Sequence, residues 1–267
     1  MKPEYARAYR DLYQRHWWWR AREAVLLREI EPHAPAGGWQ TILDVGCGDG
    51  LFFDRLRAFG EPWGVEVDAS LVPPDSPHRS HIHIGGFDGT YRAPGPIGLV
   101  LMLDVLEHLH EPVQALRHAR NLLAPHGNVL ITVPAFRVLW TRHDDLNQHL
   151  VRYTRTTLNR VVRAAGLIPV SSRYLFHWLF PSKLVVRALE RLALSAGGPA
   201  TVPPTAINRA LYYLCRAEER SLGWARLPLG TSLLAWCVKG AEQALAPEGP
   251  RDAAATAAGG RQVTPAA

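Results

Sequence analysis

The most informative segment for the fold is Ile42-Leu43-Asp44-Val45-Gly46-Cys47-Gly48-Asp49-Gly50. Residues 41–46 are mostly apolar and predict a buried strand, after which the glycines form a turn into a helix near residues 50–58. The alternation continues, with strands expected at 63–67, 81–85, 98–103 and 128–133 and helices at 111–123 and 154–165. Strands that alternate with helices of about a dozen residues indicate a parallel α/β sheet.

Helices are expected on both sides of this core. One covers residues 5–30, including Trp17–Trp19, and two more at 174–195 and 206–222 precede a last strand at 231–238. Beyond residue 246 the chain is rich in Ala, Gly, Pro and Thr, which favours a disordered tail. Five segments follow: an N-terminal helical cap (1–38), an α/β core (39–172), a helical insertion (173–228), the last strand and end of the core (229–245) and the tail (246–267).

The 267 residues carry a net charge of +6 that is unevenly distributed. Residues 1–150 hold 15 Lys and Arg against 18 Asp and Glu, whereas residues 151–267 hold 15 against 6. The second half is therefore expected to attract an anionic substrate or a phospholipid surface. The N-terminus is too polar for a signal peptide, and the three cysteines show no metal-binding spacing. A reduced, cytoplasmic protein is expected, peripheral to the membrane if it meets one.

The glycine turn predicts a ligand site. Glycines let a ligand approach the backbone closely, and open α/β sheets bind ligands at the carboxyl ends of their strands. A dinucleotide fingerprint would need glycine at position 51, which is Leu. Asp44 would repel a pyrophosphate, but it suits a ligand that carries a positive charge.

Glu66 stands at the end of the second strand, where a carboxylate can accept hydrogen bonds from both hydroxyls of a ribose. The alternative is that Glu66 and Asp68 only solvate the end of a strand. A ligand with a ribose, a cationic or amino-acid part and no pyrophosphate matches S-adenosylmethionine.

Four motifs together carry a family resemblance. The segments ILDVGCGDG (42–50), GVEVD (64–68), LMLDVLEHL (101–109) and LLAPHGNVLITVPAF (122–136) resemble the class I S-adenosylmethionine-dependent methyltransferase family, over roughly residues 40–172. The flanking segments HWWWRAREAVLLREI and LWTRHDDLNQHLVRYTRTTL resemble an uncharacterised bacterial subgroup. The resemblance implies a Rossmann-like α/β fold, with a seven-stranded, mostly parallel sheet and an antiparallel last strand.

The resemblance also implies roles for individual residues. In the cofactor site, the turn contributes Asp44, Gly46, Cys47, Gly48 and Gly50, the ribose acid is Glu66, Val67 lies beside the adenine, Asp88 meets the adenine amino group, and Met102, Leu103 and Asp104 line the methionine side. The sequence departs from the family's pattern at Ile97-Gly98, where Phe-Asp usually opens the fourth strand, and at Gly85-Gly86 before Asp88.

The acceptor side is expected in the segment after the fifth strand. Residues 140–153 contain the candidate catalytic residues His149, His143, Arg152 and Tyr153. Either histidine could act as the base, while Arg142 and Arg152 would hold an anionic acceptor. The alternative is a polar loop that covers the sheet, with His149 and Tyr153 as local caps.

Glu107 and His108 raise the question of a metal. Related quinone O-methyltransferases resemble this segment with an acid-x-x-Glu-His set, which here would be Asp104, Glu107 and His108. Two carboxylates and an imidazole suit a divalent cation. The alternative, that Glu107 and His108 position the neighbouring loop, is preferred, and no metal is expected.

The sequence thus predicts a methyltransferase that uses S-adenosylmethionine. Its acceptor is expected to be small or lipid-linked and anionic, met at an anionic membrane surface. An RNA or protein methyltransferase is the second hypothesis, although no nucleic-acid module is seen and no nucleic acid is expected as a partner. The third is a non-catalytic protein with the same fold. The oligomeric state and the methylated atom, O, N or C, stay open.

Overall fold

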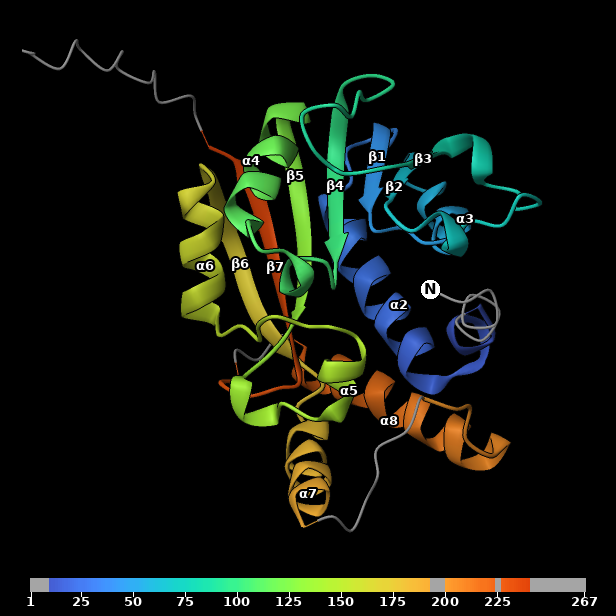
Figure 1. The fold of residues 1–267 in the computed structure, drawn as a ribbon, viewed down its shortest axis with the longest axis vertical. Helices are drawn as coiled ribbons and strands as arrows, with labels where there is room; N and C mark the ends of the chain where they lie inside the picture. Colours follow the sequence, from blue (N-terminus) through green and yellow to red (C-terminus); the bar gives the residue numbers. More distant parts are fainter. Residues whose placement is uncertain (1–9, 193–199, 224–226, 241–267) are drawn as a thin grey trace, which may run out of the picture.

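The computed structural model describes residues 10–192, 200–223 and 227–240, and its centre is one seven-stranded sheet (Figure 1). The strand order is β3-β2-β1-β4-β5-β7-β6. The strands are β1 (Trp39–Val45), β2 (Gly60–Glu66), β3 (Ile82–Ile84), β4 (Ile97–Leu103), β5 (Leu123–Pro134), β6 (Leu167–Leu175) and β7 (Ser232–Lys239). β7 pairs antiparallel with both β5 and β6, while the other pairs are parallel. The expected Rossmann-like fold with an antiparallel last strand is confirmed.

Helices cover both faces of the sheet. The helices of the described residues are α2 (Trp17–Ile30), α3 (Phe53–Leu56), α4 (Pro112–Leu122), α5 (Arg142–Leu146), α6 (Arg155–Ala164), α7 (Leu179–Arg191) and α8 (Thr205–Leu222). The apolar sides of α4 and α6 pack with one face of the sheet, and those of α2 and α3 pack with the other. Burial of these apolar sides is what holds the helices to the sheet.

Two expectations about secondary structure are wrong in detail. The helix near residues 50–58 is only the single turn α3. The region expected to be helical from residue 174 instead ends strand β6 at Leu175, and α7 begins at Leu179. β6 lies at the edge of the sheet and leaves Ile168 and Val170 exposed, so it lacks the clean alternation that marks a half-buried strand.

The N-terminal helix is broken once. Residues 10–15 are helical, His16 accepts a hydrogen bond from the amide of Trp18 through Nδ1, and α2 starts at Trp17. The tryptophans are half-buried: the Trp17 ring lies 5.9 Å from Trp178 and the Trp18 ring 6.2 Å from Phe176. The expected helix over residues 5–9 and the expected tail lie outside the described residues.

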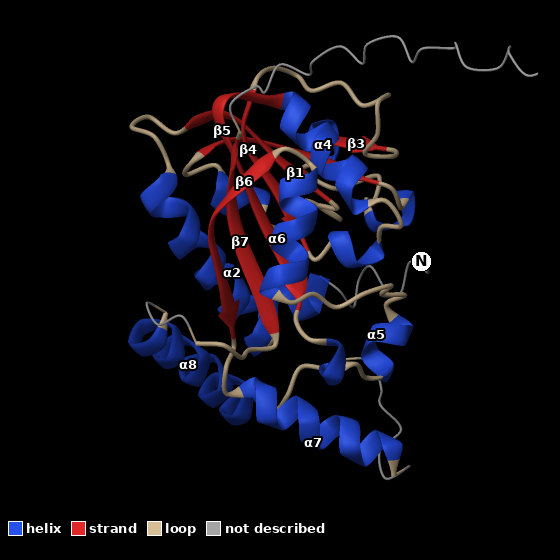
Figure 2. Cartoon of the chain, turned by 90° about the vertical axis from the view of Figure 1, so that its left-hand side faces the viewer, coloured by secondary structure: helices blue, strands red, loops and turns tan. Residues whose placement is uncertain are grey.

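The carboxyl ends of the parallel strands point toward the end of the molecule that carries α5, α7 and α8 (Figures 1 and 2). The glycine turn after β1, the end of β4 and the segment after β5 therefore meet at that end. Among the described residues, no helix is long and apolar enough to span a bilayer.

Candidate active site

The glycine turn leaves β1 in backbone conformations that favour glycine. Gly46, Gly48 and Gly50 have φ values of 74°, 55° and 70°. A Cβ placed on Gly48 would meet nothing within 4 Å, whereas one on Gly46 would lie 3.0 Å from Val105 Cγ2. The turn thus presents bare backbone to an open space at Gly48 and packs tightly beneath it.

Glu66 is fixed against this turn. Its carboxylate accepts hydrogen bonds of 2.9 Å from the amides of Gly48 and Asp68. The side chain is only 6% exposed, while the next residue, Val67, is 77% exposed. Each carboxylate oxygen still has a lone pair for a further donor, so the carboxylate can also accept from ribose hydroxyls beside the apolar surface of Val67.

Asp44 lies buried beneath the turn. Burial raises the pKa of its carboxyl group to about 7, against the opposing effect of the Arg22 charge. A cationic ligand group would favour the ionised form. Burial likewise raises the pKa of the Cys47 thiol, so Cys47 lines the site as a neutral group.

The end of β4 is held by the N-terminal helix. Arg22 of α2 pairs with Asp104 at 2.8 Å and donates a 3.0 Å hydrogen bond to Thr132 Oγ1, which bonds Asp104 in turn. Asp104 has a φ of 58°, a backbone conformation uncommon outside glycine. Leu103 lines a cavity of about 50 Å³ together with Arg22 and Asp44, whereas the side chain of Met102 is buried in the core and faces away from it.

Asp88 lies apart from these groups. Its exposed carboxylate accepts hydrogen bonds from the amide and hydroxyl of Thr90, at 2.8 and 2.6 Å. These bonds lower its pKa and cap its own turn. Phe87 packs against His118, with ring centroids 4.7 Å apart. The adenine role of Asp88 stays a prediction.

Asp144 organises the segment after β5. It is fully buried and accepts from His149 Nδ1 at 2.8 Å, from Arg152 Nε at 2.8 Å and from the Thr141 amide at 2.9 Å. Burial opposes ionisation, yet these bonds hold the pKa of Asp144 well below its usual range. A permanently ionised Asp144 favours a proton on His149 Nδ1, which leaves Nε2 as the acceptor.

The other three acceptor-side candidates lie differently. Arg152 also donates to the Ala135 carbonyl at 2.9 Å, so its guanidinium is used inside the protein rather than offered to an acceptor. Tyr153 is buried, donates to the Leu106 carbonyl at 3.3 Å, and has its pKa raised to about 12 by burial and by Glu107. His143 is on the exposed surface beside Asn147, outside the Asp144 network.

Glu107, His108 and His149 form the one candidate metal cluster in the described part of the chain. Their ligating atoms lie within 4.8 Å of one another. Both carboxylate oxygens of Glu107 are buried without a hydrogen bond to any described residue, and burial together with Asp104 raises its pKa well above the usual range. Asp104, part of the set suggested by the resemblance, is instead paired with Arg22.

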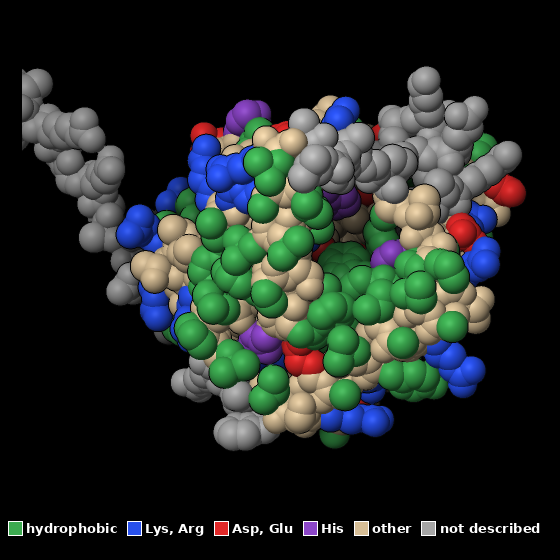
Figure 3. Space-filling view, turned by 90° about the horizontal axis from the view of Figure 1, so that it is seen from below, with side chains coloured by type: hydrophobic (Ala, Val, Ile, Leu, Met, Phe, Trp, Pro, Cys, Tyr) green, Lys and Arg blue, Asp and Glu red, His purple; other side chains and the backbone are tan. Residues whose placement is uncertain are grey.

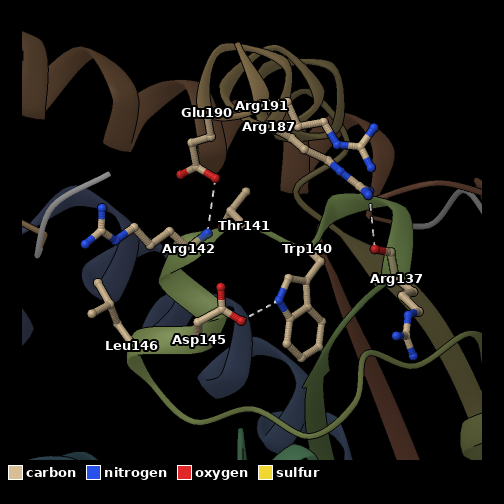
Figure 4. A pocket seen from close by; sticks show the side chains of 9 residues that line it. All are labelled: Arg137, Trp140, Thr141, Arg142, Asp145, Leu146, Arg187, Glu190 and Arg191. Atoms are coloured by element: carbon tan, nitrogen blue, oxygen red, sulfur yellow. Dashed lines mark hydrogen bonds between the residues drawn. The ribbon is translucent and has the colours of Figure 1, made fainter. Parts of the chain in front are cut away.

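Arg22 and Thr132 were not predicted from the sequence, because no local spacing links them to Asp104: Thr132 lies 28 positions from Asp104 and Arg22 lies 110 positions from Thr132. A second cavity, of about 770 Å³, between α5, the turn η5 (Arg137–Leu139) and α7, was not predicted either (Figure 4). Figure 4 shows arginine side chains of these elements around it. Its signals in the sequence were the helical spacing of Lys183, Arg187 and Arg191 and the cation Arg142, which was expected to hold an anionic acceptor and lines this cavity.

The sheet topology and the family match identify a class I S-adenosylmethionine-dependent methyltransferase. Residues 4–172 match the family described as "Methyltransferase domain", and the chain belongs to that family. S-adenosylmethionine is the cofactor, and the residues around the glycine turn fit it. When bound, it supplies an electrophilic methyl group.

Individual relatives are distant. The chain is 25% identical over 190 residues to the "Ubiquinone biosynthesis O-methyltransferase" of Caulobacter vibrioides, covering 66% of this chain and 64% of that protein. It is 27% identical over 218 residues to an "Uncharacterized 37.1 kDa protein in transposon TN4556" of Streptomyces fradiae, covering 78% of this chain and 55% of that one. These matches thus span less than two thirds of the relatives' lengths. A putative methyltransferase solved with the Haloferax volcanii Trm112 activator superposes with a TM-score of 0.56 at 16% identity, over 90% of this chain and 96% of that one, and shares the fold.

Proposed function

We propose that the protein transfers the methyl group of S-adenosylmethionine to a hydroxyl of a small or lipid-linked, anionic acceptor, with His149 as the base. The observation that supports this most is the 2.8 Å contact between His149 Nδ1 and the buried carboxylate of Asp144. It gives an imidazole at the carboxyl end of the sheet a fixed orientation and a free Nε2.

The chemistry is an in-line displacement. S-adenosylmethionine, held at the glycine turn and Glu66, would supply an electrophilic methyl group to the acceptor oxygen and would leave as a neutral thioether that keeps the electron pair of the broken carbon–sulfur bond. The hydroxyl proton passes to His149 Nε2, and the imidazolium so formed is stabilised by Asp144. Arg152 and the Thr141 amide hold Asp144 in place, so both are positioning groups.

Three features support the class of acceptor. Among the relatives, the Caulobacter vibrioides protein is named as an O-methyltransferase, which favours a hydroxyl. The second half of the chain, with 15 Lys and Arg against 6 Asp and Glu, favours an anion. The helices α7 and α8 expose aliphatic side chains beside cations at the same end as the active site, which favours a lipid-linked acceptor met at an anionic membrane surface.

The test compares His149→Ala with His143→Ala. Turnover is followed as S-adenosylhomocysteine formed with phenolic carboxylates, starting with 3,4-dihydroxybenzoate, which combines hydroxyls with an anion. His149→Ala is expected to lower turnover by about 10²–10⁴-fold while leaving S-adenosylmethionine binding intact. His143→Ala, outside the Asp144 network, should keep near-full turnover. Equal activity of the two variants would show that His149 is not the base and would support the alternative that residues 140–153 only cover the sheet.

A further inference from the structure

The cavity between α5, η5 and α7 has an unusual set of charges. Arg137, Arg142, Arg187 and Arg191 line it, against only two acids, Asp145 and Glu190. Both acids are already engaged: Asp145 accepts from Trp140 Nε1 at 2.9 Å, and Glu190 accepts from the Arg142 amide at 3.1 Å. The cavity therefore keeps a surplus of positive charge.

Part of that charge is not used within the protein. The guanidinium groups of Arg137 and Arg191 make no hydrogen bond or ion pair with any residue that the structure describes. Arg187, one turn before Arg191 on α7, donates to the backbone carbonyl of Val138. Clustered guanidinium groups present forked donors that match phosphate oxygens, and like charges brought together favour an anion among them.

The helix α7 presents two different faces. Lys183, Arg187 and Arg191 follow one another every four residues and form one stripe, two of whose members line the cavity. Val185, Leu189 and Leu192 form a second stripe, because two residues along a helix turn through about 200°. Val185 is 59% and Leu192 67% exposed, and no residue of α7 is buried. The exposed apolar side chains of α7 thus face solvent, while two of its cations, Arg187 and Arg191, line the cavity.

The helix α8, at the same end of the molecule, also exposes apolar side chains (Figure 2). On α8, Ile207, Tyr213 and Leu214 are exposed. Figure 3, which views the end of the molecule that carries α7 and α8, shows hydrophobic side chains gathered around a hollow, with Lys and Arg at the margin. A ligand that satisfies both surfaces has an anionic head and a hydrocarbon chain.

We propose that this cavity is a phosphoryl-binding site for an amphiphile, whose phosphate lies on the side of the cavity that carries Arg137, Arg187 and Arg191 and whose hydrocarbon chain lies on the exposed face of α7. The cavity volume of about 770 Å³ is ample for a phosphate or diphosphate. The site lies on the face of α5 that carries Arg142 and Asp145, and Asp144 on the other side of the helix holds His149. It is therefore separate from the proposed base, and phosphoryl binding does not depend on the proposed methyl transfer.

The experiment measures binding of decyl phosphate and methyl phosphate to the full-length chain by titration calorimetry. Decyl phosphate should bind, and methyl phosphate, which has the same head without the chain, should bind at least about tenfold more weakly. The double variant Arg137→Gln/Arg191→Gln should weaken decyl phosphate binding by at least about tenfold. Arg160→Gln/Arg163→Gln, on the exposed side of α6, removes the same charge elsewhere and should leave binding unchanged. S-adenosylmethionine binding reports that each variant is folded.

A second set of variants tests whether the hydrocarbon chain of the ligand lies on α7. Val185→Ser/Leu189→Ser should weaken the binding of decyl phosphate but not that of methyl phosphate. Ile168→Ser, on the edge strand β6, should change the binding of neither. Equal losses in the two arginine pairs, or no loss in either, would overturn the site. Equal affinity for the two phosphates would overturn the amphiphile and leave a soluble phosphate ester as the ligand.

Vesicles identify the source of the phosphoryl group. Cosedimentation is measured with vesicles of phosphatidylcholine alone and of phosphatidylcholine mixed with phosphatidylglycerol. Binding to the mixed vesicles that is lost in Arg137→Gln/Arg191→Gln and kept in the α6 pair supports headgroups of a bilayer as the occupant. Binding of decyl phosphate without vesicle binding supports a single lipid-linked molecule. Failure of both would overturn the proposal, whatever the outcome of the turnover test on His149.

Discussion

Glu66 joins two parts of the cofactor site. Its carboxylate bonds the amides of Gly48 and Asp68, so it fixes the glycine turn against the end of β2 before any ligand arrives. The groups it contacts lie within twenty residues of it, so the local spacing of glycines and acid was enough to indicate that they lie together, while the ribose role of Glu66 stays a prediction. Asp104 is the opposite case. It follows β4, its partner Arg22 lies on the distant helix α2, and no local pattern in the sequence links the two residues.

Glu66→Ala should weaken S-adenosylmethionine binding. The ribose hydroxyls lose a charged acceptor, a loss of about 1.5–3 kcal/mol or roughly ten- to a hundredfold in Kd. Titration calorimetry measures it. Glu61→Ala removes the same charge from the same strand, where Glu61 pairs with His81 on the surface, and should leave the affinity unchanged. If both variants bind as the wild type does, Glu66 is not the ribose acceptor.

The helix α2 is tied to the carboxyl ends of β4 and β5. It packs its buried face, including Ala21 and Leu26, on the sheet and sends Arg22 to the ends of β4 and β5. The helix itself was predicted from the sequence, but its place over the cofactor turn was not, since only the three-dimensional path brings it there. The edge strand β6 was missed for a different reason: it is neither fully buried nor regularly alternating.

Arg22→Met is therefore expected to loosen α2. Asp104 and Thr132 lose a charged hydrogen-bonding partner, which should cost about 1.5–3 kcal/mol locally. Hydrogen exchange should become faster in residues 17–30 and stay unchanged in α4 and α6, since those helices lie on the opposite face. Arg15→Met, which breaks an exposed ion pair with Asp11, should leave exchange in α2 unchanged. Unchanged exchange in both variants would show that packing alone holds the helix.

The order of strands across the sheet follows from the family resemblance rather than from periodicity. β7 inserts between β5 and β6, which no pattern in residues 231–238 indicates. The stability of this assembly also depends on a group whose environment the sequence could not show: Glu107, buried at the junction of β4 and the segment after β5, where its carbonyl accepts from the Leu150 amide at 2.7 Å.

Glu107 makes the free energy of unfolding depend on pH. Its pKa is raised in the folded protein, so the folded state binds the proton more tightly than the unfolded chain does. The resulting stability is complete below the unfolded pKa of about 4.3 and is lost as pH rises toward the folded pKa. Glu107→Gln keeps the shape without the proton, so its stability relative to wild type should increase as pH rises from about 5, measured by urea unfolding.

Glu111→Gln, a surface change on the same side of the molecule, should show no such trend. Addition of EDTA distinguishes the metal alternative. A cation held by Glu107, His108 and His149 would stabilise wild type at neutral pH, and EDTA would remove that advantage over Glu107→Gln. A pH-independent difference between the two proteins would contradict a protonated Glu107.

Leu175 and Ser232 face each other in the β6–β7 ladder. The chain therefore leaves the sheet after Leu175 and rejoins it at the neighbouring Ser232. Residues 176–231, which include α7 and α8, form one insertion whose two ends are adjacent. Because the entropic cost of loop closure grows only slowly with loop length, such an insertion can be lengthened or exchanged while the strand register stays intact. Relatives with this sheet can thus diverge here, acquiring new acceptor preferences while inheriting the same cofactor chemistry unchanged.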